Sequence, residues 1–106
     1  MKENLEQIID NYGYKHQLKK LNEEVFEFQE AVRDYEYLYE DSWTELIVEQ
    51  VEKYKKHIEE EYADVMVMME QFKAYYNLDN NNIIDIMNKK INRQIDRIES
   101  ENNNEN

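Results

Sequence analysis

The sequence has no cysteine, no proline and only one glycine among its 106 residues. Without cysteine, the chain can form no disulfide framework and can supply no thiolate for chemistry. Proline and glycine are the residues that most strongly interrupt helices, so almost nothing in this chain stops one. Convincing period-two alternation of apolar residues is also missing, and we therefore predict an all-α fold.

Long apolar runs and basic charge are scarce as well. No run approaches the roughly 18 residues of a membrane-spanning helix, and the N-terminus does not resemble a signal peptide. The net charge is −12, so the phosphate backbone of a nucleic acid would be repelled. We expect a soluble, cytoplasmic protein that binds neither membranes nor nucleic acid polymers. At this length we predict one domain over residues 1–99 and a disordered polar tail over residues 100–106.

What the sequence does contain is apolar residues that recur every three or four positions, which predicts amphipathic helices. The predicted helices cover residues 3–12, 16–39 and 43–76, and a fourth helix follows Asp79. Gly13 suits the end of the first helix, Ser42 opens a capping box for the third, and Asp79 caps the fourth. The third helix would be roughly 50 Å long. We therefore expect a break near residues 53–57 or a free end that packs on another subunit.

One acidic residue interrupts the apolar stripe of the third predicted helix. The residue that should continue the stripe is Glu61, and Asp64 follows one turn later. A buried carboxylate without a partner costs several kcal/mol or gives up its charge, so Glu61 needs a physical reason to be there. On the second predicted helix, Glu24 and Glu27 are also three residues apart and lie along one edge of the stripe.

Antiparallel packing of these two helices would bring the four carboxylates together. Four carboxylates cannot share one place without a bound cation or raised pKa values. Oxygen ligands without histidine or cysteine suit a hard ion, so we predict Mg²⁺, or Mn²⁺, as the cofactor. The alternative is a solvated acidic face, because Glu-x-x-Glu spacing is common in a chain this acidic. The predicted metal ligands are Glu24, Glu27, Glu61 and Asp64.

Basic residues gather on the fourth predicted helix, where Lys90, Arg93 and Arg97 line one flank. They are either ordinary cations near a helix C-terminus or a clamp for phosphate groups, to which arginine can donate two parallel hydrogen bonds. Gln17 lies two turns before Glu24 on the same edge. Gln17 and Trp43 are candidates for contacting a nucleotide base, with ordinary surface and core roles as alternatives. His16 and His57 are predicted to be surface histidines.

Three segments together resemble the MazG-like, all-α nucleoside triphosphate pyrophosphohydrolases. The segment QLKKLNEEVFEFQEAV resembles the family's Gln-Leu-x-x-Leu-x-Glu-Glu stretch, and EEEYADVMVMM resembles its Glu-Glu-x-x-Asp-Val helix. Downstream, KKINRQIDRI resembles its basic helix, with Lys followed three residues later by Arg. The chain departs from short family members in the 33 residues between Glu27 and Glu61, which imply a longer helical hairpin.

The resemblance implies a four-helix MazG-like bundle. The over-long third helix, and more apolar stripes than four helices can cover alone, predict that oligomerisation completes this bundle, as a homodimer or homotetramer. It also implies a Mg²⁺-dependent enzyme that cleaves a nucleoside triphosphate between the α and β phosphates, giving the monophosphate and pyrophosphate. By this likeness the four carboxylates are catalytic metal ligands, and Lys90 and Arg93 contact the phosphates. Two other functions stay open. One is a phosphoribosyl-ATP-type pyrophosphohydrolase, and the other is a non-catalytic helical interaction protein.

Overall fold

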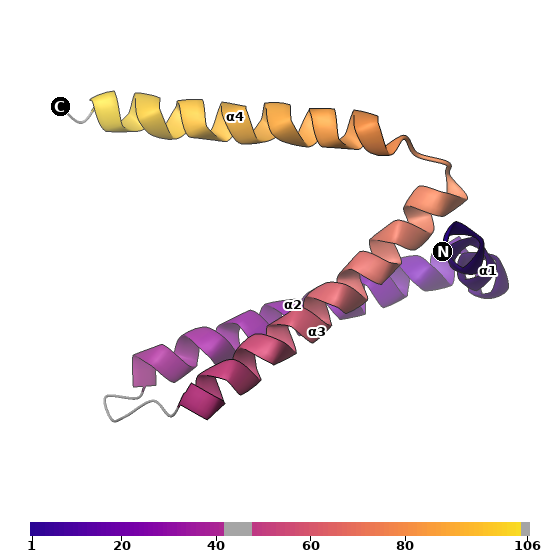
Figure 1. Cartoon of the computed structure of the whole chain (residues 1–106), viewed down its shortest axis with the longest axis horizontal. Helices are drawn as coiled ribbons and strands as arrows, with labels where there is room; N and C mark the ends of the chain where they lie inside the picture. Colours follow the sequence, from indigo (N-terminus) through magenta and orange to yellow (C-terminus); the bar gives the residue numbers. More distant parts are fainter. Residues whose placement is uncertain (42–47, 105–106) are drawn as a thin grey trace. The chain divides into compact units, whose positions relative to one another are not determined.

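The computed structural model describes residues 1–41 and 48–104, and this part of the chain is helical throughout apart from short connections (Figure 1). The prediction of an all-α fold is therefore confirmed. No strand occurs in the described residues. The helices are α1 (Lys2–Tyr12), α2 (Tyr14–Asp41), α3 (Val48–Tyr75) and α4 (Asn80–Asn104).

Two helix boundaries follow the local chemistry that the sequence predicts. Gly13 ends α1 with φ 87°, and its N–H donates to the carbonyl of Ile9 at 2.8 Å. A side chain is strained at this positive φ, so glycine suits the position. The carboxylate of Asp79 accepts from the backbone N–H groups of Asn81 at 2.9 Å and Asn82 at 3.3 Å, which confirms it as the cap of α4.

The described residues divide into two compact units, 1–76 and 77–106. In the first unit α2 and α3 run side by side as an antiparallel hairpin, and α1 packs at the end of this hairpin where α2 begins (Figure 1). The fully apolar core is small and consists of Ile9, Ala31, Met68 and Ala74. Around it, the apolar stripes of α2 and α3 are mostly half-buried, with Leu18 exposed. These stripes align the two long helices.

Helix α3 is continuous from Val48 to Tyr75, with no break at residues 53–57. Three of the five residues in this range are lysines, which favour helices, and neither proline nor glycine interrupts them. The predicted capping box at Ser42 and the predicted start of this helix at Trp43 lie outside the described residues.

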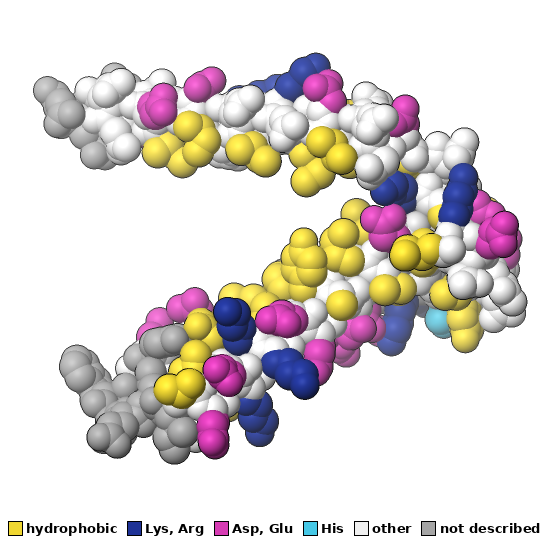
Figure 2. Space-filling view, in the orientation of Figure 1, with side chains coloured by type: hydrophobic (Ala, Val, Ile, Leu, Met, Phe, Trp, Pro, Cys, Tyr) yellow, Lys and Arg dark blue, Asp and Glu magenta, His cyan; other side chains and the backbone are white. Residues whose placement is uncertain are grey.

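The second unit contains α4, which the structure describes as a single amphipathic helix. Its apolar residues gather on one side (Figure 2), and each is about half exposed: Ile84, Met87, Ile91, Ile95 and Ile98. The helix continues through Asn104, so most of the segment predicted as a disordered tail is helical. Once a helix has started, adding a residue costs far less than nucleation, and no glycine or proline stops it. No helix in the described ranges has the length and apolar character needed to cross a membrane.

Candidate metal centre

The register of the α2–α3 hairpin sets which polar residues meet across it. Gln17 of α2 contacts Gln71 of α3. Glu24 follows Gln17 by seven residues on α2, and Asp64 precedes Gln71 by seven residues on α3. Glu24 and Asp64 also lie close together. Seven residues are about two helical turns, so these pairs lie on the same seam between the helices. The interruption of the α3 stripe by Glu61 therefore falls opposite the acidic pair of α2.

Three carboxylates converge on this seam. Glu24 from α2 and Glu61 and Asp64 from α3 each place one oxygen so that the three atoms lie within 4.8 Å of one another. Glu24 is buried at 7% exposure, Glu61 is half-buried and Asp64 is exposed, so the group opens from the seam towards solvent. Carboxylate oxygens from two elements, open on one side, can ligate a hard cation and leave room for its other ligands.

Two oxygens of this group are buried without a hydrogen-bond partner among the described residues, Glu24 Oε2 and Glu61 Oε2. The second oxygen of each residue has a nitrogen atom of a basic side chain nearby. Glu24 Oε1 is 3.2 Å from Lys20 Nζ, and Glu61 Oε1 is 3.9 Å from His57 Nε2. Buried polar atoms are nearly always paired, because an unpaired one loses its hydration without compensation. A divalent cation would satisfy both oxygens, so the residues present fit the metal that the sequence suggests.

Glu27, the fourth predicted ligand, is exposed and lies outside this group of three. It still interacts with the group, since the negative charge of Glu24, then burial, then the charge of Glu61, raise the pKa of Glu27 above its ordinary value. A carboxyl with a raised pKa in the folded state contributes stability below its unfolded pKa. That contribution is lost as pH rises through the folded pKa. In the metal-free protein, ionisation of Glu27 is therefore less favourable in the folded state than in the unfolded state.

Lys20 is a site residue that the sequence reading did not single out. Its ion pair with Glu24, through hydrogen bonding first and charge second, raises the pKa of Lys20, so it is a cation at neutral pH. The available signal was the four-residue spacing of Lys20 and Glu24, which places them on one face of a helix. His57 is exposed, as predicted, and also lies 3.9 Å from Glu60.

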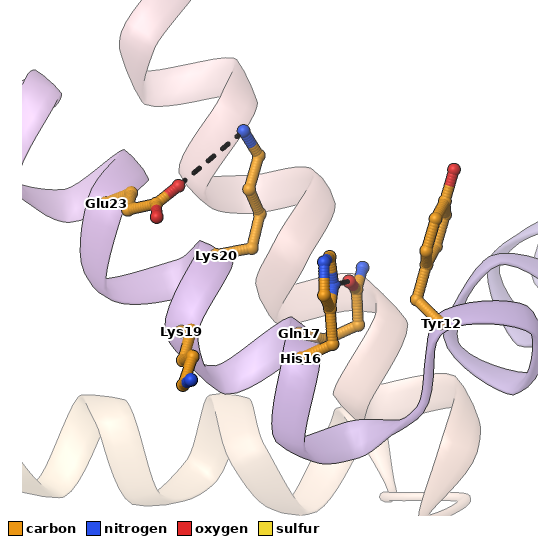
Figure 3. Close-up of a pocket in the computed structure, with 6 residues that line it drawn as sticks. All are labelled: Tyr12, His16, Gln17, Lys19, Lys20 and Glu23. Carbon is orange, nitrogen blue, oxygen red and sulfur yellow. Dashed lines mark hydrogen bonds and ion pairs between the residues drawn. The ribbon is translucent and has the colours of Figure 1, made fainter.

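A pocket of about 420 Å³ is lined in part by Lys20 (Figure 3), the residue that pairs with Glu24 of the carboxylate group. Its lining residues come from the end of α1 and the first three turns of α2: Tyr12, His16, Gln17, Lys19, Lys20 and Glu23. Gln17 is only 4% exposed, and its side-chain amide pairs with Gln71 and His16. Direct contact between Gln17 and a base stays a prediction.

Lys90 and Arg93 lie on α4, which belongs to the second unit. Both are exposed, and α4 places them three residues apart, on one side of the helix. Their neighbour Lys89 pairs with Asp85 at 3.2 Å. Their contact with phosphates stays a prediction, and Trp43 lies outside the described residues.

Comparisons of the chain with protein-family models, with curated proteins and with solved structures found no match.

Proposed function

We propose that this protein is a Mg²⁺-dependent nucleoside triphosphate pyrophosphohydrolase that releases pyrophosphate and a nucleoside monophosphate. The observation that supports it best is the convergence of Glu24, Glu61 and Asp64, with two buried carboxylate oxygens that lack partners. The order of these acids along the chain is the one that resembles the MazG-like enzymes. A structural role alone gives no reason to retain two unpaired buried oxygens.

In this proposal Glu24, Glu61 and Asp64 hold the metal, with Glu27 at the edge of the site. When bound, Mg²⁺ neutralises the triphosphate and activates a water for attack on the α-phosphorus. The raised pKa of Glu27 suits this carboxylate to accept a proton from the attacking water. Lys20, released from Glu24, can donate to a phosphate oxygen, and we also assign Lys90 and Arg93 to phosphate binding.

We further propose that the protein is a cytoplasmic homodimer or homotetramer in which α4 completes a helical bundle. The support is the half-exposed apolar side of α4, since covering such a stripe is the usual way in which an amphipathic helix is stabilised. The monomer mass is 13.1 kDa. Sedimentation equilibrium is expected to give two or four times this mass, and a monomer at micromolar concentration would contradict the proposal.

Pyrophosphate release from a panel of ribo- and deoxynucleoside triphosphates tests the reaction. Release is expected with Mg²⁺ and is expected to stop with excess EDTA. At about one hundred times its Kd, Mg²⁺ should raise the melting temperature by roughly 10 °C, because it binds only the folded state. The rise should be smaller at lower pH, because protons compete with the metal for the carboxylates and the pKa of Glu27 is raised.

Three other outcomes of this test would point elsewhere. Hydrolysis of phosphoribosyl-ATP alone would favour that type of enzyme, which shares the metal site and differs in the base pocket. Mg²⁺ binding without release from any nucleotide would contradict the proposed reaction. Neither release nor a metal-dependent melting temperature would favour a helical interaction protein.

A further inference from the structure

The pocket beside the carboxylate group has the composition of a nucleotide site. Tyr12 and His16 stack with their ring centroids 5.3 Å apart and their planes at 19°, which forms an aromatic platform at one side of the pocket. Tyr12 is more than half exposed, so a second planar ring can stack on this platform. Figure 3 shows Tyr12, His16 and Lys20 extending towards the same side of α2 in this view. The Nζ atom of Lys20 lies 3.2 Å from Oε1 of Glu24, one of the three converging carboxylates.

A buried chain of amides behind the pocket selects the tautomer of the neutral His16 imidazole. Gln71 is 2% exposed, and its Nε2 faces the sulfur of Met68 at 3.6 Å. A thioether can only accept a hydrogen bond, so the amide nitrogen of Gln71, and not its oxygen, must face the sulfur of Met68. The opposite orientation would leave a buried carbonyl oxygen against sulfur without a donor, which is unfavourable.

The orientation of the Gln71 amide determines the orientation of the Gln17 amide and the tautomer of His16. Its Oε1 accepts from Gln17 Nε2 at 2.7 Å, so Gln17 must present its Oε1 to His16 Nδ1, 2.8 Å away. That contact is a hydrogen bond only if Nδ1 carries the proton. In the neutral imidazole Nε2 is then an acceptor. The hydrogen bond recorded for His16 among the described residues is the one at Nδ1, so Nε2 can accept from a ligand.

The distance from the pocket to the carboxylates matches the length of a nucleotide. His16 and Glu24 are eight residues apart on α2, which is about 12 Å along the helix. A sugar and one phosphate span a comparable distance between a base and a metal. The pocket volume of about 420 Å³ also lies in the range of small-ligand sites.

We infer that this pocket binds the base of the substrate and selects bases whose exocyclic amino group is on C6 of a purine or C4 of a pyrimidine, opposite His16 Nε2, namely adenine or cytosine. Guanine and uracil place a carbonyl oxygen at the corresponding position, where two acceptors would face each other. A site built to accept a hydrogen bond rejects a ligand that cannot donate it. The inference rests on the proposed function for the identity of the substrate. In it His16 is a specificity residue, and Gln17 and Gln71 are positioning residues.

Titration calorimetry of AMP, CMP, GMP and UMP with Mg²⁺ tests the inference without requiring hydrolysis. AMP and CMP are expected to bind about tenfold more tightly than GMP and UMP, as one hydrogen bond implies. His16→Ala, at an exposed position, should bring the four affinities within about twofold of one another. Nitrogen-15 spectra of the wild-type imidazole should show the proton on Nδ1.

Gln71→Leu separates positioning from packing, because it leaves His16 in place and removes the group that orients Gln17. The preference for AMP and CMP should fall, and the imidazole proton should populate both nitrogens. Gln50→Leu, at an exposed position on α3, is the matched control and should change neither.

Equal binding of the four monophosphates, or a proton on Nε2 in the wild type, would overturn the base site. These outcomes are distinct from failure of the proposed reaction. Preferential binding of AMP and CMP without pyrophosphate release from any triphosphate would support the base site and contradict the reaction. Release without base preference, and without an effect of His16→Ala, would support the reaction and contradict the base site.

Discussion

Glu61→Ala is expected to reduce metal-dependent pyrophosphate release about 1,000-fold or more, the scale of losing an essential electrostatic group. Glu61 supplies one of the three converging carboxylates, and its Oε2 is buried without a partner among the described residues. The substitution also removes a negative charge from an acidic group. The folded state should therefore be as stable as the wild type, or more stable by about 1 kcal/mol in the absence of metal. Initial rates and urea denaturation measure the two effects.

Glu59→Ala is the matched control, since it removes the same side chain from an exposed position of α3 two residues away. It should retain activity and the dependence on Mg²⁺. If Glu61→Ala remained active, the carboxylate site would be wrong, whatever the nucleotide. If it were inactive because it had unfolded, circular dichroism would show the loss of helix, and the isosteric Glu61→Gln would then test the ligand role.

Ile9→Ala should destabilise the first unit by about 2–5 kcal/mol, a large part of the stability of a domain this small. Ile9 is fully buried, and it is the residue by which α1 packs against the α2–α3 hairpin. Replacing it leaves a cavity in a core of only a few apolar residues, which can collapse only in part. The midpoint of urea denaturation, followed by circular dichroism, measures the change.

Leu18→Ala is the control for Ile9→Ala because it removes the same number of carbon atoms from an exposed position. It should cost less than about 1 kcal/mol. Equal effects of the two substitutions would mean that α1 does not anchor the unit, or that Leu18 is covered in an oligomer. Sedimentation of the Leu18→Ala protein distinguishes these two explanations.

The helical class and several local features follow from the sequence alone. A chain without proline and with one glycine, carrying apolar residues every three or four positions, can bury them only as helices. Gly13 and Asp79 mark helix ends because their effects depend on the backbone of a few neighbouring residues. Glu61 was recognisable as unusual for a similar reason. The periodicity of its own helix places it on the apolar face, whatever that face packs against.

Which residues meet across the α2–α3 hairpin depends on how the two helices pack. A helical pattern defines a face but not its partner. The register that brings Glu24 to Asp64, and Gln17 to Gln71, depends on how α2 and α3 slide along each other. His16 looked like an ordinary surface histidine in the sequence. Its ring is oriented by its neighbour Gln17, and Gln17 is oriented in turn by Gln71, which is 54 positions away from Gln17. Such pairings arise from packing between helices, which local sequence periodicity does not encode.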